Sequence, residues 1–173
     1  KKAAGKEAQN YDNRIPGVSI HYKDAIELVT KGASQACLVV EQETVTRTSR
    51  NVVARIEGTD KTEEILTLTA HYDSVPEGPG AYDNMSGGAI IMELCRYFQT
   101  HRPRRTMEFV WFGAEEKGLL GSQSYVKVHE AELSAHRFNM NVDLAGQLVG
   151  GTVVGVTGDA SICNMITYMG HEI

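Results

Sequence analysis

The stretch EILTLTAHYDSVPEGPGAYDNMSGG, residues 64–88, decides the fold. Its first eight residues are mostly apolar or β-branched, which is typical of a buried strand. After His71 the chain is rich in proline, glycine and acidic residues, and a helical pattern begins near SGG. A buried strand followed by a helix is the unit of an α/β fold. Because ligands in such folds bind beyond the carboxyl ends of the strands, we expect a site at His71.

Composition describes an ordinary globular chain. The 173 residues are 42% apolar, and no repeat, low-complexity tract or linker divides them, so we predict one domain over residues 1–173. The net charge of −5 argues against a nucleic-acid partner. The one basic cluster, His101 to Arg105, is interrupted by Pro103 and is interpreted as a helix end and loop. No apolar run approaches the ~18 residues of a membrane helix. The sequence gives no indication of an oligomeric state.

Hydrophobic periodicity predicts strands and helices along the whole chain. Strands are predicted over 36–47, 51–58, 64–71, 106–112, 138–144 and 152–158, and helices over 22–32, 86–101, 121–133 and 160–170. From residue 63 onward strands alternate with helices. The predicted fold is therefore α/β, with a mixed, mainly parallel central sheet flanked by helices and antiparallel strands on its N-terminal side.

The three cysteines do not form a recognisable framework. Cys37, Cys95 and Cys163 are an odd number without CxxC spacing, so neither a thiolate zinc site nor a disulfide pattern is indicated. Because each lies in an apolar setting, we expect three buried thiols.

Histidine and acidic side chains follow three of the predicted strands. In chain order they are His71, Asp73 and Asp83, then Glu115 and Glu116, then Asp143. So many carboxylates at one rim would repel each other unless cations neutralised them. Histidine nitrogen with carboxylate oxygen suits Zn²⁺, and a shared carboxylate, here Asp83, can hold two ions about 3.5–4 Å apart.

Two local patterns refine this hypothesis. His71 and Asp73 alternate near a strand end, so Asp73 is expected either to orient the imidazole or to act near the metals. Glu115 and Glu116 converge only if they lie in a loop, which Gly113 and Gly118 permit. One glutamate would then bind metal while the other moves protons.

Four motifs in order, HYDS, GAYDNMSGG, GAEEKGLLGS and NVDLAG, resemble the co-catalytic zinc aminopeptidases of the aminopeptidase Y and aminopeptidase S type. Relatives of that family include glutamate carboxypeptidases and glutaminyl cyclases. The resemblance runs from about residue 50 to 146. It implies a zinc-exopeptidase fold and a peptide substrate with a free N-terminus, and it suggests a secreted or extracytoplasmic protein.

The resemblance also assigns roles by motif position. It implies that His71, Asp83 and Asp143 hold one zinc, and that Asp83 and Glu116 hold the other. Glu115 would be the general base and Asp73 the orienting acid. A cis peptide bond is implied after the bridging aspartate, between Asp83 and Asn84.

One implied ligand has no match. The family's second zinc takes a histidine from a later loop, and His171, the only late histidine, does not fit that motif. We therefore expect that the C-terminal part of the fold lies beyond this sequence. The alternative is a domain that binds one zinc well and the other poorly. Whether the fragment alone is active stays open.

Three other functions compete with an aminopeptidase. A deacylase-type zinc exopeptidase shares HxD and an EE pair, but there the bridging aspartate lies farther from the histidine than the twelve residues between His71 and Asp83. A carboxypeptidase is not separated by these motifs. A non-catalytic peptidase-like domain would be expected to have lost ligands, whereas those within this span are intact.

Overall fold

The computed structural model describes residues 18–39, 41, 43, 45–147, 151 and 153–171. The chain divides into two compact units, residues 1–48 and 49–173. The first contains helix α1 (Tyr22–Thr30), whose first turn is capped by the ring nitrogen Nδ1 of His21, which accepts the Lys23 N–H at 3.2 Å. Gly32, with φ of +61°, follows the helix, as its position in the sequence predicts.

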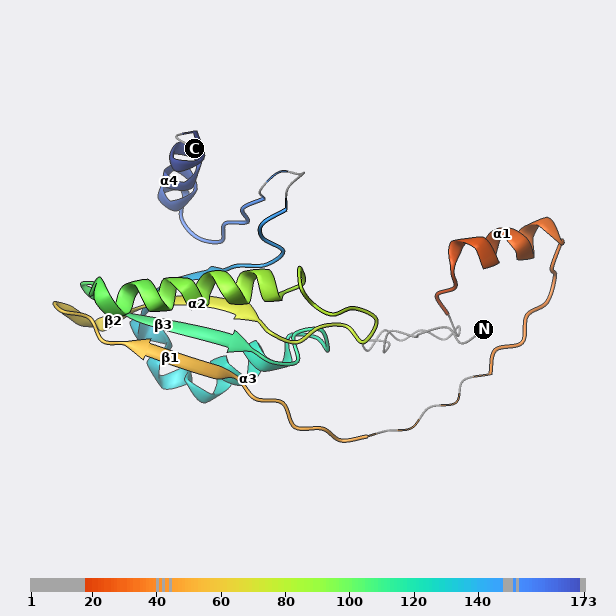
Figure 1. Cartoon of the computed structure of the whole chain (residues 1–173), viewed down its shortest axis with the longest axis horizontal. Helices are drawn as coiled ribbons and strands as arrows, with labels where there is room; N and C mark the ends of the chain where they lie inside the picture. Colours follow the sequence, from red (N-terminus) through yellow and green to blue (C-terminus); the bar gives the residue numbers. More distant parts are fainter. Residues whose placement is uncertain are drawn as a thin grey trace. The chain divides into compact units, whose positions relative to one another are not determined.

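The second unit is built on a four-stranded sheet with the order β1-β3-β2-β4 (Figure 1). The strands are β1 (Val52–Ile56), β2 (Lys61–His71), β3 (Arg105–Phe112) and β4 (His136–Asn141). β2 runs parallel to both β3 and β4, while β1 runs antiparallel to β3. The predicted mixed, mainly parallel sheet with an antiparallel N-terminal extension is confirmed.

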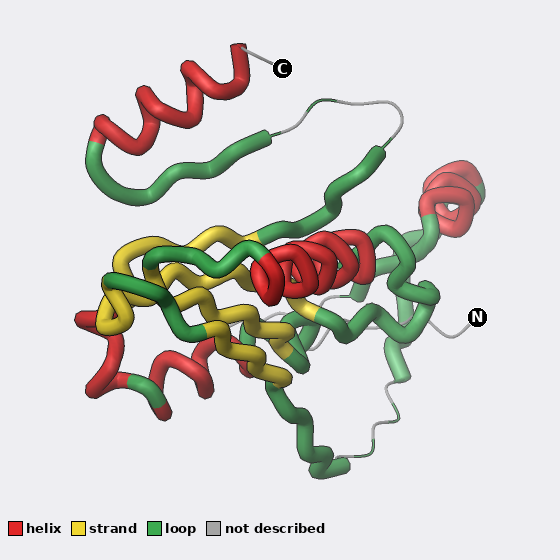
Figure 2. The backbone as a smooth tube through the Cα atoms, turned by 60° about the vertical axis from the view of Figure 1, so that its left-hand side comes forward, coloured by secondary structure: helices red, strands yellow, loops and turns green. Residues whose placement is uncertain are grey.

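Helices cover both faces of this sheet (Figure 2). Helix α2 (Met85–Thr100) lies on one face, and helix α3 (Leu120–Val128) with the 3₁₀ helix η1 (Glu130–Ala135) lies on the other. The α2 side holds the apolar core, formed by Leu68, Ala70, Ile91, Cys95, Met107 and Phe109. Burying this stripe holds α2 against the strands, so its N-terminus stays at the carboxyl end of β2.

The face beneath α3 is more polar. Glu108 is only 4% exposed, and its carboxylate accepts a hydrogen bond from the Tyr125 hydroxyl. The Arg55 guanidinium lies 3.6 Å from the same carboxylate. Burial, together with the hydrogen bond to Glu108, raises the pKa of Tyr125 above its ordinary value. A buried carboxylate is thus satisfied by one hydroxyl and one cation.

Two predicted strands do not appear in the part of the chain that the structure describes. Among the described residues of 36–47 and of 152–158, none belongs to a strand. Both stretches have β-branched side chains, yet Val39 and Val153 are largely exposed, so burial does not stabilise an extended chain there. The helix predicted over 121–133 is interrupted near His129, where α3 ends and η1 follows. Helix α4 (Ala160–His171) lies where predicted.

The cysteine prediction was correct at one position. Cys95 is buried against the sheet, whereas Cys37 and Cys163 are exposed, because they lie in segments outside the apolar core. All three are free thiols. Within the described residues, no helix combines the length and apolar character needed to cross a membrane.

Candidate metal centre

Three parallel strands end at the same rim of the sheet. His71, the last residue of β2, pairs in register with Phe112 of β3, and Thr69 pairs with Asn141 of β4. The segments that leave these strand ends carry the acidic residues predicted from sequence. The arrangement therefore brings the three motifs to one place, as expected for a parallel sheet.

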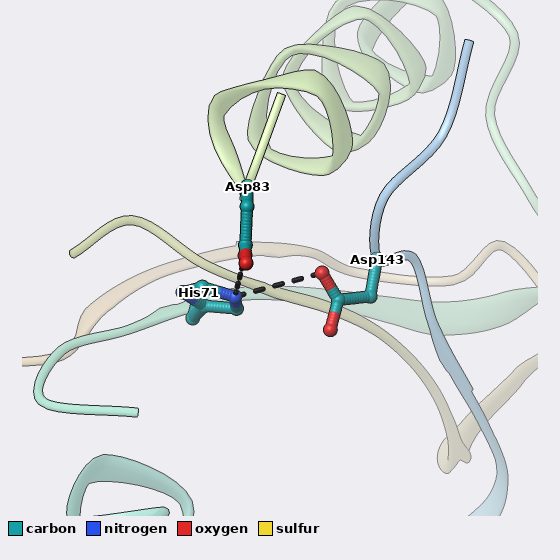
Figure 3. Close-up of side chains that lie close together, drawn as sticks. All are labelled: His71, Asp83 and Asp143. Atoms are coloured by element: carbon teal, nitrogen blue, oxygen red, sulfur yellow. Dashed lines mark ion pairs between the residues drawn. The ribbon is translucent and has the colours of Figure 1, made fainter. Parts of the chain in front are cut away.

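His71 is the centre of the cluster. Its Nε2 atom lies 3.1 Å from Asp83 Oδ1 and 3.5 Å from Asp143 Oδ1, and these three side chains point toward one another (Figure 3). Glu115 Oε2 lies 3.8 Å from the same nitrogen. The His71 side chain is 4% exposed while that of Asp83 is 49% exposed, so the imidazole is held in the protein and the acids face the solvent side.

The charges in the cluster influence one another strongly. Burial lowers the pKa of His71, but the carboxylates of Glu115 and Asp143 outweigh it, and the net pKa lies above the ordinary value. Burial raises the pKa of Glu115, His71 opposes this rise, and the nearby carboxylate of Glu116 adds to it. A carboxyl group with a raised pKa beside other acids is suited to proton transfer.

Asp73 contacts the cluster in two ways. Its backbone carbonyl accepts a hydrogen bond at 3.1 Å from His71 Nδ1, which leaves Nε2 directed at the acids. Its carboxylate lies 3.6 Å from Nδ1 and accepts the backbone N–H groups of Glu115 at 3.0 Å and Glu116 at 3.1 Å. Asp73 therefore joins the end of β2 to the glutamate turn.

The glutamates lie in a turn between β3 and α3. Ala114 has φ of +56° and Gly118 has φ of +102°, and this local bend directs both acids toward the same side. Glu116 Oε1 is buried and has no hydrogen-bond partner among the described residues. A buried carboxylate oxygen without a donor is costly unless a cation binds it.

The Asp83 segment is held against the Asp143 segment. Asn84, which is 1% exposed, donates to the Val142 carbonyl at 2.9 Å and accepts the Leu144 N–H at 3.3 Å. The Asp83–Asn84 peptide bond is cis, as the resemblance implies. A Cβ atom on Gly87 would lie 2.2 Å from the Val142 carbonyl oxygen, so the close approach of α2 to the end of β4 requires glycine.

Ligand atoms gather in two overlapping groups. His71, Asp83 and Asp143 form one, and His71, Glu115 and Glu116 form the other, each with atoms within 4.8 Å of one another. One imidazole with carboxylate oxygens is a donor set that fits Zn²⁺. The unpartnered Glu116 oxygen supports the same fit. His71, Asp83, Asp143, Glu115 and Glu116 are therefore brought together, with Asp73 beside them.

The remaining candidate, His171, is not part of this group. It lies in the last turn of α4, and its side chain falls outside the described part of the structure. Tyr82 and Ser86, which lie in the GAYDNMSGG motif without an assigned role, also contact the Asp143 segment. Polar residues are common at the start of any helix, so the sequence carries only a weak signal for these contacts.

Residues 51–171 match peptidase family M28, and the chain belongs to this family. It is 38% identical over 134 residues to aminopeptidase YwaD of Bacillus subtilis (strain 168), covering 76% of this chain and 29% of that protein. It is 35% identical over 125 residues to leucine aminopeptidase 2 of Trichophyton equinum, covering 72% of this chain and 25% of that protein. The chain thus spans less than a third of the length of either relative.

Solved structures give the same result for the fold. BSAP, a zinc aminopeptidase from Bacillus subtilis, matches with a TM-score of 0.52 and 40% identity, covering 56% of this chain and 24% of that chain. A peptidase M28 precursor from Shewanella amazonensis SB2B matches with a TM-score of 0.52 and 41% identity, covering 54% of this chain and 22% of that chain. The mixed α/β fold of this chain thus matches these solved structures over about half of its length.

Proposed function

We propose that this chain supplies most of the metal site of a zinc-dependent peptidase that releases amino acids from the N-terminus of peptides. The observation that carries the proposal is the convergence of His71 Nε2 with the carboxylates of Asp83, Asp143 and Glu115 at the carboxyl ends of three strands. The relatives named aminopeptidases support the substrate class.

The metal ligands that we assign are His71, Asp83, Glu116 and Asp143, with Asp83 shared between two ions. When bound, zinc supplies a Lewis acid that polarises the substrate carbonyl and makes water a stronger acid. The two groups of ligand atoms centred on His71 are compatible with more than one ion. A further ligand from elsewhere in the full-length protein would complete the second position.

Glu115 is the residue that we assign as general base. Its carboxylate takes a proton from the attacking water and returns it to the nitrogen of the leaving amine. Two observations support this role: its side chain is 30% exposed, so water reaches it, and its Oε2 atom lies 3.8 Å from His71 Nε2, beside the assigned ligands. Glu116, one residue on, has a buried oxygen suited to holding metal.

Asp73 is assigned as the residue that orients these groups. Through its carbonyl it sets the direction of the His71 ring, and through its carboxylate it holds the backbone of both glutamates. It therefore acts on ligand and base together.

The proposal is tested with the full-length protein and two peptides, one with a free N-terminus and one with an acetylated N-terminus. We expect zinc-dependent release of the first residue from a free peptide, and no release after the N-terminus is acetylated. Release of the last residue instead would indicate a carboxypeptidase, and cleavage of the acetyl group a deacylase. A folded protein that binds no zinc and cleaves neither peptide would indicate a non-catalytic domain.

A further inference from the structure

We propose that Tyr82, Asn84 and Ser86 are positioning residues that set the place of Asp143 relative to Asp83 and His71. The inference rests on the proposed function, because it assumes that Asp143 binds metal. The three residues occupy every second position from 82 to 86, and the first two flank Asp83. We call them the aspartate clamp. None of them is assigned as a metal ligand.

The clamp forms hydrogen bonds with the chain on both sides of Asp143. The Tyr82 hydroxyl donates to the Leu144 carbonyl at 2.6 Å, and the Ala145 N–H donates to Ser86 Oγ at 3.1 Å. Asn84 donates to the Val142 carbonyl at 2.9 Å and accepts the Leu144 N–H at 3.3 Å. Four hydrogen bonds thus link residues 82–86 to residues 142–145.

The sheet does not hold this segment by itself. The last backbone hydrogen bond between β2 and the end of β4 runs from the Val142 N–H to the Thr69 carbonyl at 2.9 Å. Beyond Val142, the hydrogen bonds described for residues 143–145 all go to the clamp. Leu144 also adopts a left-handed backbone, with φ of +53°, so the chain bends sharply just after Asp143.

The clamp therefore fixes the position of Asp143 relative to the loop that carries Asp83. Both carboxylates approach one nitrogen, His71 Nε2, at 3.1 Å and 3.5 Å, and small shifts of either loop change the spacing between them. Metal affinity is sensitive to such shifts, because residues that orient ligands contribute substantially to binding. The clamp fits this requirement, since it joins the two ligand-bearing loops directly.

The test uses two variants that each remove one hydroxyl, Tyr82→Phe and Ser86→Ala, in the full-length protein. Asn84 is unsuitable alone, because it is 1% exposed and its loss risks unfolding. Zinc affinity is measured by competition with a chelator. Tyr82→Phe removes one hydrogen bond, whereas Ser86→Ala removes two, because Ser86 Oγ also donates to the Tyr82 carbonyl at 2.7 Å. We expect each variant to bind zinc at least about two- to tenfold more weakly, which is the range for one lost hydrogen bond, and the double variant to bind more weakly still.

Two controls separate positioning from general damage. Tyr97→Phe removes a phenol hydroxyl at the far end of α2, where the side chain is 52% exposed, and we expect unchanged affinity. Ser86→Thr keeps a hydroxyl and is expected to restore affinity to within twofold. If Ser86 did not act through its hydroxyl, Ser86→Thr would not restore the zinc affinity that Ser86→Ala loses.

Amide hydrogen exchange of the metal-free protein provides the second readout. We expect the Ala145 amide to exchange faster in Ser86→Ala, with Tyr72, whose N–H donates to Phe112, unchanged. Equal zinc affinity in wild type and both variants would overturn the inference alone, even if Ala145 exchanges faster. A wild-type protein that binds no zinc would overturn the proposed function and the inference with it.

Discussion

Asp73 and Glu115 lie just beyond the ends of the neighbouring strands β2 and β3, and the carboxylate of Asp73 accepts the backbone N–H of Glu115 at 3.0 Å. The second carboxylate oxygen accepts the N–H of Glu116 at 3.1 Å. Two consecutive amides bound by one carboxylate define the direction of the turn, because charged acceptors form strong hydrogen bonds. Asp73, which has no assigned metal contact, thus holds the backbone of both glutamates in place.

Replacing Asp73 with alanine tests this relationship. We expect kcat to fall by about 10- to 100-fold, the range for residues that orient metal ligands. The amides of Glu115 and Glu116 should exchange faster in hydrogen-exchange measurements, because they lose their acceptor. Glu77→Ala, in the exposed loop that follows Asp73, is the control and should change neither quantity. Unchanged exchange at both glutamates would rule out this role for Asp73.

Two adjacent glycines in α2 should respond differently to alanine. At Gly87 a new Cβ would lie 2.2 Å from the Val142 carbonyl oxygen, whereas at Gly88 its nearest neighbour would be Trp111 at 3.6 Å. We expect Gly87→Ala to lower the free energy of unfolding by about 1–3 kcal/mol, as overpacking does. Gly88→Ala should be neutral or stabilising by up to about 1 kcal/mol, because alanine favours helix. Urea denaturation measures both, and equal effects would contradict the close approach.

Glu115→Gln tests the general base. The amide cannot take a proton from water, so we expect kcat to fall by about 10²- to 10⁴-fold while zinc content stays the same. Glu77→Gln in the exposed loop serves as the matched control. Turnover close to wild type in Glu115→Gln would assign the proton transfer to another group.

The buried pair Tyr125 and Glu108 predicts loss of stability at alkaline pH. The folded pKa of Tyr125 lies above the ordinary value of 10.0, so above about pH 10 the folded state binds more protons than the unfolded state. The free energy of unfolding should therefore fall as the pH rises through this range. In Tyr125→Phe the decrease should be smaller, and stability at neutral pH should drop by about 1–3 kcal/mol, because Glu108 loses its donor.

Denaturation of wild type, Tyr125→Phe and Tyr97→Phe across this pH range measures the effect. Tyr97 is 52% exposed, so its loss should leave the alkaline decrease intact. An identical decrease in wild type and Tyr125→Phe would show that another group causes it.

Much of this site follows from the sequence because strand ends are local features. His71 and Asp143 each follow an apolar stretch, and parallel strands bring such ends to one rim without knowledge of distant contacts. The glutamate turn was predictable for a similar reason, since adjacent acids converge only in a bend. Their roles required the resemblance, because residue type alone does not separate a ligand from a base.

Other features depend on partners that the sequence does not reveal. The residues over 36–47 have strand composition, yet those that the structure describes form no strand, because a strand forms only where another strand pairs with it. The polar atoms of Asn84 and Tyr82 find acceptors about sixty positions away, and no periodicity encodes such a distance. The sequence likewise does not show that Glu108 is buried and paired, because its partner Tyr125 lies on the next helix.

The central claim is that His71 and the surrounding carboxylates form a zinc site, and zinc binding tests it most directly. Zinc bound per protein is measured for the full-length wild type and for His71→Ala, with His129→Ala as the control, since His129 stacks on Tyr125 and belongs to neither group of ligand atoms. Saturation at a hundred times the dissociation constant should also stabilise the wild type by about 2.7 kcal/mol. We predict bound zinc in wild type and His129→Ala and its loss in His71→Ala. Zinc bound equally by His71→Ala, or absent from the wild type, would contradict this account.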